Sequence, residues 1–142
     1  MKTKTIIALS GVANQGKSTS IKMAYALLKD AYPNAQVEEL YIGVDITVVI
    51  TINGVKVGIE SQGDPNRRLF KSLGHFVSIG CKVIICATRS RGNTVEAVNA
   101  LAGKYKIDWY PKSGASFASK QATANRSVAQ QILAAVQAAI DA

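Results

Sequence analysis

The sequence has few cysteines and no long apolar run, and each of these features excludes certain classes of protein. Cys81 and Cys86 are its only two cysteines, five positions apart in one apolar run. As residues of one strand they would point to opposite faces of a sheet and would not pair, so we expect two buried thiols in a reducing compartment. No stretch approaches the roughly 20 apolar residues that a membrane-spanning helix needs. We therefore expect a soluble, cytoplasmic protein with no membrane partner.

Acidic residues are scarce relative to basic ones. The chain has 17 lysines and arginines against 9 aspartates and glutamates, which gives a formal net charge of +8. Such an excess favours anionic partners. Because nucleotide phosphates would account for part of it, the charge leaves nucleic acid open as a second partner without requiring one.

Strand and helix patterns alternate along the chain, and no linker, repeat or low-complexity segment divides it. With 142 residues, 48% of them hydrophobic, the chain can bury one core, so we expect a single domain over residues 1–142. The strand patterns cover residues 4–10, 44–52, 55–60, 81–87 and 106–110. The helical patterns cover residues 17–32, 65–79, 94–104 and an alanine-rich end that includes 128–140. The turn Asn53-Gly54 predicts that the second and third strands form an antiparallel hairpin. The alternation predicts an α/β fold with helices on both faces of a mostly parallel, five-stranded sheet.

One motif stands between the first strand pattern and the first helical pattern. Residues 11–18, GVANQGKS, fit G-x-x-x-x-G-K-[ST] at every fixed position. Gly11 and Gly16 allow a tight turn and a close approach of the backbone to phosphate oxygens. The loop N–H groups and the positive end of the helix dipole would converge on that anion. Lys17 is electrostatically unfavourable at a helix N-terminus unless an anion lies there. The motif therefore predicts a nucleoside triphosphate site.

With this motif in this context, the chain resembles the P-loop NTPase superfamily. The resemblance implies a three-layer P-loop NTPase fold, with Mg²⁺ bound beside the nucleotide. It also implies that Lys17 acts on the β- and γ-phosphates as a catalytic residue and that the Ser18 hydroxyl is a ligand of Mg²⁺. The nucleotide-binding residues that it implies are Gly11, Val12, Ala13, Asn14, Gln15, Gly16, Lys17, Ser18 and Thr19.

Part of the motif is similar to the P-N-x-G-K-S-T version of translation-factor-like GTPases. In that branch a hairpin strand ends in D-x-x-G, and Glu60-Ser61-Gln62-Gly63 stands at this place here, with Glu for Asp. Guanine is selected there by the Asp of [NT]-K-x-D. The corresponding residues 88–91, TRSR, end in Arg91 instead of that acceptor. We therefore expect ATP, and not GTP, as the nucleotide.

A second acidic group is expected to hold Mg²⁺ through water, and the sequence leaves its identity open. Glu60 is favoured, because the C-terminal tip of a strand lies beside the phosphate site in open α/β sheets. Asp64 is the alternative, although it also suits the turn before Pro65. Asp45 offers a third carboxylate, for which a solvated position on a strand is the favoured interpretation.

Arginines and one glutamine complete the candidate site. Arg89 and Arg91 follow the strand pattern 81–87 at the edge where ligands bind, so they are candidate catalytic residues that would stabilise charge on the γ-phosphate. Gln62 is a candidate for positioning an attacking water. Arg67 and Arg68 begin the second helical pattern and offer further positive charge.

Three functions follow from these residues. The first is an ATPase or a nucleotide-dependent switch, with Lys17 and Ser18 at the phosphates and the metal. The second is a small-molecule or nucleotide kinase that holds an anionic acceptor with the four arginines named above. The third is a nucleic-acid or protein-binding module in which the nucleotide is a structural ligand, which the net charge favours.

Overall fold

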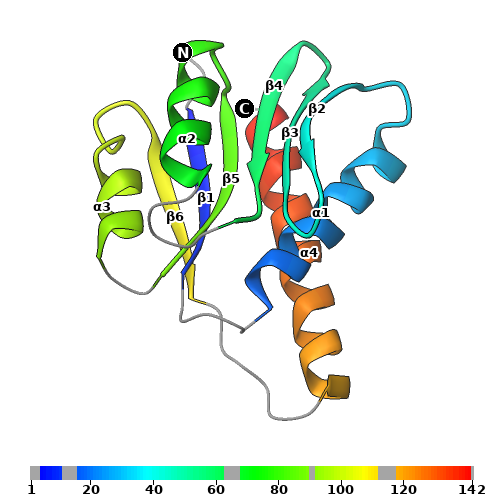
Figure 1. Ribbon diagram of the computed structural model, residues 1–142. Helices are drawn as coiled ribbons and strands as arrows, with labels where there is room; N and C mark the ends of the chain where they lie inside the picture. Colours follow the sequence, from blue (N-terminus) through cyan, green and yellow to red (C-terminus); the bar gives the residue numbers. More distant parts are fainter. Residues whose placement is uncertain (1–3, 11–15, 63–67, 90–91, 112–117, 142) are drawn as a thin grey trace.

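The computed structural model describes residues 4–10, 16–62, 68–89, 92–111 and 118–141. The elements alternate between strands and helices along these residues (Figure 1). They are β1 (Thr5–Ser10), α1 (Lys17–Ala31), β2 (Gln36–Ile42), β3 (Ile46–Ile52), β4 (Val55–Glu60), α2 (Arg68–Ser78), β5 (Val83–Thr88), α3 (Asn93–Asn99), β6 (Lys106–Pro111) and α4 (Ala118–Asp141). None of the helices within these ranges is both long enough and apolar enough to cross a membrane.

The six strands form one mixed sheet in the order β2-β3-β4-β5-β1-β6. β1 is parallel to β5 and to β6, and β4 is parallel to β5. β3 is antiparallel to both of its neighbours, β2 and β4. Asn53 and Gly54 join β3 to β4 with φ angles of 51° and 80°, so the predicted hairpin is confirmed.

The sheet has one strand more than the five that the sequence predicts. The additional strand is β2, whose seven residues are all exposed. Hydrophobic alternation predicts strands because it records burial on one face of a sheet. A strand that is exposed on both faces does not need alternating apolar residues, so QVEELYI shows no clear pattern. Its position in the sheet is set by its pairing with β3.

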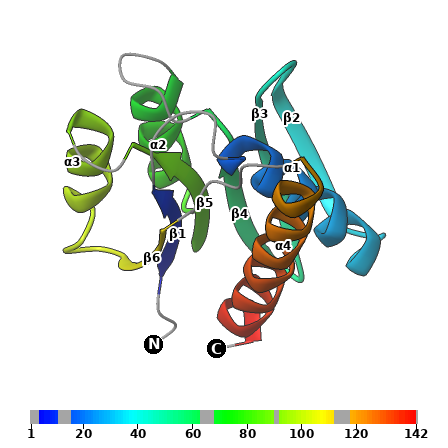
Figure 2. The ribbon, with the colours of Figure 1, turned by 90° about the horizontal axis from the view of Figure 1, so that it is seen from below.

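Helices cover both faces of the sheet, as Figure 2 shows. Alternate side chains of β1 serve the two cores. Ile7 and Leu9 join the core shared with α1 and α4, and Ile6 and Ala8 join the core shared with α2 and α3. Burial of each of the three larger side chains, Ile6, Ile7 and Leu9, contributes about 1.5–3 kcal/mol relative to an exposed one. β1, which lies between β5 and β6, is therefore held from both faces of the sheet.

The two cysteines correct one expectation. Both are buried and free, as predicted, but both belong to the core beneath α2 and α3. The prediction of opposite faces is wrong because β5 begins at Val83, so Cys81 precedes the strand and is not subject to its alternation. Burial raises the pKa of Cys81 to about 11. Burial, and then the nearby Glu60, raise the pKa of Cys86 to about 12, so both thiols are protonated at neutral pH.

Candidate functional site

The candidate site lies where β1 ends and α1 begins. Residues 11–15, which include the expected phosphate contacts of Gly11 to Gln15, lie outside the described residues. Gly16 is described, and its φ of 81° and ψ of 15° place it in the left-handed region as the N-cap of α1. Its carbonyl accepts the first helical hydrogen bond from Ser20 N at 2.9 Å. A glycine is suited to this position because side chains disfavour the left-handed conformation.

The topology makes this place a switch point of the sheet. β1 and β5 are parallel neighbours, and their last residues, Ser10 and Thr88, are paired in register. The helix after β1 packs on one face of the sheet, whereas the helix after β5 packs on the other. Adjacent parallel strands whose connections leave to opposite faces form the crevice in which open α/β sheets bind ligands.

Lys17, the first residue of α1, extends from this switch point to the end of β5. Its side chain is only 8% exposed. Its Nζ donates a hydrogen bond of 2.6 Å to the backbone carbonyl of Thr88, at the tip of β5. The ammonium group therefore lies between the ends of the two strands, close to the positive end of the α1 dipole. A cation is unfavourable there, and an anion in the crevice would offset the repulsion.

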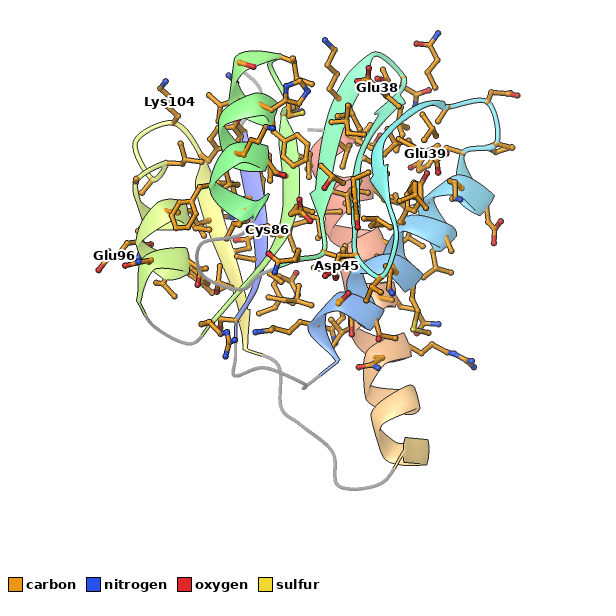
Figure 3. The ribbon with its side chains drawn as sticks, in the orientation of Figure 1. Glu38, Glu39, Asp45, Cys86, Glu96 and Lys104 are labelled. Atoms are coloured by element: carbon orange, nitrogen blue, oxygen red, sulfur yellow. The ribbon has the colours of Figure 1, made fainter. Side chains whose placement is uncertain are left out.

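Asp45 lies beside Ser18 at the start of the same helix. Ser18 Oγ donates to Asp45 Oδ1 at 2.6 Å, and Ser61 Oγ donates to the same oxygen at 2.9 Å. Ser61 in turn accepts from Ile46 N at 2.9 Å, which ties the end of β4 to the start of β3. Figure 3 shows Asp45 at the end of the hairpin next to the first turn of α1. The expectation of a solvated strand residue is wrong, because Asp45 precedes β3 and is half-buried.

Glu60, the favoured metal carboxylate, makes its described contacts elsewhere. It is fully buried, and its Oε1 accepts from Thr47 Oγ1 and from Ser72 Oγ, each at 2.6 Å. Its Oε2 accepts from Gln62 N at 3.0 Å. These partners belong to β3, α2 and the end of β4, so the carboxylate braces the α2 face of the sheet. The carboxylate that the structure brings to Ser18 is that of Asp45.

The sequence contained a signal for Asp45 that periodicity alone did not reveal. The turn Asn53-Gly54 fixes the register of the hairpin, in which Thr47 pairs with Glu60. Counting outward by two further residues places Asp45 opposite Gln62. The start of β3 and the end of β4 therefore lie side by side at the same end of the hairpin, and both can supply residues to a site there.

The remaining predicted residues are only partly described. Asp64, Arg67 and Arg91 lie outside the described residues. Arg89 follows β5 directly, is half-buried, and its backbone N donates to Thr94 Oγ1 at 2.9 Å, so it lies at the expected edge of the sheet. Gln62 is 91% buried, and its Oε1 has no hydrogen-bond partner in the described part of the chain. A buried amide oxygen of this kind is an acceptor open to a ligand or a water molecule.

Asn125 of α4 is a site residue that the sequence did not indicate. It is 5% exposed, and its Oδ1 accepts from Ser20 Oγ at 3.2 Å. A Cβ built on Gly16 would lie within 3.0 Å of the Asn125 amide group. Asn125 therefore packs directly against the last glycine of the motif. The contact joins residues more than a hundred positions apart, so no local pattern could have predicted it.

The donor set around Ser18 suits a hard cation. Its groups are hydroxyl and carboxylate oxygens, which Mg²⁺ prefers, and one or two such protein ligands are usual because Mg²⁺ retains several waters. Within the described ranges, no three histidine, cysteine, aspartate or glutamate side chains are grouped so as to hold a metal by themselves. A cation here would accordingly be shared with an anionic ligand.

Comparison of the chain with protein-family models, with curated proteins and with solved structures found no match in any of the three.

Proposed function

We propose that this protein binds ATP with Mg²⁺ at the carboxyl ends of β1 and β5 and hydrolyses it to ADP and inorganic phosphate. The observation that carries the proposal is the position of Lys17. The side chain is buried at the first residue of α1, and its ammonium group donates to the Thr88 carbonyl at the end of β5. A polyphosphate there would convert an unfavourable cation at a helix N-terminus into a favourable ion pair.

The G-x-x-x-x-G-K-S pattern supports a P-loop NTPase fold for the chain. A buried strand leads into the pattern and α1 follows it, with the left-handed Gly16 at the junction. In this proposal the backbone N–H groups of residues 11–16 bind the phosphate oxygens and Lys17 contacts the β- and γ-phosphates. Thr88 would give up the ammonium group, or share it, when the nucleotide enters.

Mg²⁺ would be held by Ser18 directly and by Asp45 through water. Both groups already lie within hydrogen-bond distance of one another at the start of α1. The bound ion would neutralise charge on the β- and γ-phosphate oxygens. Ser61 would keep the Asp45 carboxylate aimed at the site, since its hydroxyl donates to the same oxygen that Ser18 uses.

Adenine is the proposed base because the chain lacks a guanine-reading carboxylate in the expected place. Residues 88–91, TRSR, follow the tip of β5, where such a carboxylate would have to stand. Arginine cannot accept a hydrogen bond from the guanine ring. Adenine needs no such acceptor and is held by stacking and backbone contacts.

Water is the proposed acceptor of the phosphoryl group. Gln62 Oε1 would accept a hydrogen bond from a water molecule and orient its oxygen toward the γ-phosphorus. A bond forms between that oxygen and phosphorus, the bond from phosphorus to the β–γ bridging oxygen breaks, and the proton from the water passes to the phosphate product. Arg89, at the same edge of the sheet, would stabilise the charge that leaves with ADP.

The first test measures ATP binding by titration calorimetry with Mg²⁺ present. Lys17→Ala removes a charge-assisted contact worth about 1.5–3 kcal/mol, so the Kd should rise roughly tenfold to 150-fold. Lys29→Ala is the matched control, because Lys29 is exposed in the last turn of the same helix. Absence of saturable binding, or an equal loss in both variants, would refute the proposal.

The second test separates hydrolysis from transfer and identifies the carboxylate. Inorganic phosphate should be released from ATP without an added acceptor. Asp45→Ala should raise the Mg²⁺ concentration needed for half-maximal activity about tenfold, since one water-mediated ligand is lost. Asp30→Ala, on the exposed side of α1, should leave it unchanged. Phosphate that appears only with an added small molecule would show a kinase instead.

A further inference from the structure

β2 forms an open edge of the sheet. It pairs with β3 on one side and, in the strand order of the described residues, has no strand on the other. All seven of its residues are exposed. Such an edge presents unpaired N–H and C=O groups that can bind another extended chain, and proteins usually shorten or cover it. The pairing of β2 with β3 is irregular between Glu39 and Tyr41, but the rest of this seven-residue strand presents an edge to which a further strand can add.

Large apolar side chains gather on this edge. Five of the six large apolar side chains exposed in the described residues belong to β2 and to the turn after it. They are Val37, Leu40, Tyr41, Ile42 and Val44, and their exposed fractions run from 40% to 84%. The sixth, Phe70, is on α2. Exposed apolar residues scattered singly need no explanation, but five that are neighbours along one edge strand and its turn favour an interaction site.

A groove adjoins the edge on the α2 side of the sheet. Its volume is about 390 Å³, and one wall is made by Leu40 and Tyr41 of β2. Lys71 and His75 of α2 form the opposite wall, while Thr47 and Ser72 also line it. Because the last two bind the buried Glu60, the groove has a rigid base. It can accept apolar side chains from a strand that lies along β2.

The charge around the edge selects the partner. β2 carries two of the chain's nine acidic residues and no lysine or arginine. Glu38 and Glu39 lie on β2 itself, as Figure 3 shows. Two copies of β2 paired with each other would bring these carboxylates together, which opposes a symmetric dimer. A basic strand would complement them.

We infer that β2 is a docking site for an extended, basic segment of a partner protein, which adds to the sheet as a further strand. Main-chain hydrogen bonds to the free edge give the affinity, and alternate side chains give the specificity. Apolar residues of the segment enter the groove beside Leu40 and Tyr41. Its lysines or arginines lie on the other face of the sheet beside Glu39, which pairs with Val48 and accepts a hydrogen bond from Tyr25 of α1. The inference does not depend on nucleotide binding, because it uses none of the residues at the start of α1.

The experiment uses the full chain and a synthetic peptide of alternating lysine and valine as the probe. Hydrogen exchange followed by NMR should show slower exchange of the β2 amides when the peptide is added at up to millimolar concentration. A peptide of alternating glutamate and valine is the control and should leave exchange unchanged. If the lysine peptide gives no protection, or if both peptides protect equally, the inference is overturned.

Variants locate the contact. Glu39→Lys should weaken binding of the lysine peptide about threefold to tenfold, and added salt should reduce the difference. The matched control is Glu96→Lys, an exposed glutamate on α3 that Figure 3 shows far from β2. Equal effects of the two changes would show general charge attraction and overturn the docking site. Protection of β2 that grows with protein concentration, without any peptide, would show a second copy as the occupant and would also overturn the inference.

Discussion

Replacing Gly16 with alanine tests the contact between the first helix and the last. The substitution introduces two separate costs. The residue has a φ of 81°, a conformation that costs a non-glycine residue about 1–2 kcal/mol. The added Cβ would also lie within 3.0 Å of the Asn125 amide group, so that group must move.

The magnitude follows from these two costs together. Moving Asn125 breaks its hydrogen bond with Ser20, worth about 0.5–1.5 kcal/mol, and disturbs a side chain that is 5% exposed. We therefore expect Gly16→Ala to lower the free energy of unfolding by about 2–4 kcal/mol. Gly80→Ala supplies the cost of the backbone alone, because Gly80 has a φ of 80° with nothing within 4 Å of an added Cβ. It should cost about 1–2 kcal/mol.

Urea denaturation, followed by the fluorescence of Trp109, measures each variant. Asn125→Ala removes the side chain that the new methyl group meets. Each single variant loses the hydrogen bond between Ser20 and Asn125, and the double variant loses the same bond only once. Gly16→Ala together with Asn125→Ala should accordingly cost less than the sum of the two single changes, by about 1 kcal/mol or more.

Two results would refute this reasoning. If the costs of Gly16→Ala and Asn125→Ala add to within about 0.5 kcal/mol, the two residues are not in contact. If Gly16→Ala costs no more than Gly80→Ala, the space beside Gly16 is open and α4 does not close the site.

Two further predictions concern the core beneath α2. Glu60→Ala should lower the free energy of unfolding by about 1–3 kcal/mol, because three buried donors lose their acceptor, and urea denaturation beside Glu96→Ala measures the change; a cost as small as that of the surface control would contradict the bracing role. Burial raises the pKa of Cys86 from 9.0 to about 12, so the folded state holds this proton more tightly than the unfolded state does. The contribution of this proton to the free energy of unfolding should be fully present below pH 9.0. It should be lost as the pH rises toward about 12, by up to about 1.4 kcal/mol per pH unit. Cys86→Ala should flatten that fall in urea midpoints measured from neutral pH upward, whereas an unchanged slope would show that other groups cause it.

Much of the fold could be predicted from local patterns. The strand that precedes the motif, the helix from Lys17 and the hairpin at Asn53-Gly54 all lie where the sequence placed them. Each has a strong local cause, namely a buried β-branched run, helical spacing of apolar residues and the preferred turn dipeptide. β2 was missed because its residues are exposed on both faces, and its partner strand alone determines its conformation.

The site was predictable where it depends on neighbouring residues. Lys17 and Ser18 could be named as candidates because the motif is contiguous. The partners that the structure gives them come from elsewhere in the chain: Thr88 from β5 and Asp45 from the turn before β3. Glu60 was favoured because ligands of open α/β sheets bind at strand tips, but its carboxylate binds Thr47 and Ser72, and the next residue, Ser61, is the one that binds Asp45.

The contact between Asn125 and Gly16 also bears on how the molecule matures on the ribosome. A nascent chain that has reached β6 already contains the whole G-x-x-x-x-G-K-S segment, but it lacks the amide that packs against Gly16 and accepts from Ser20. The surroundings of Gly16 are therefore complete only when α4 has been synthesised and has docked on α1. Under the proposed function, the complete ATP site would thus form only after the two distant parts of the chain have met.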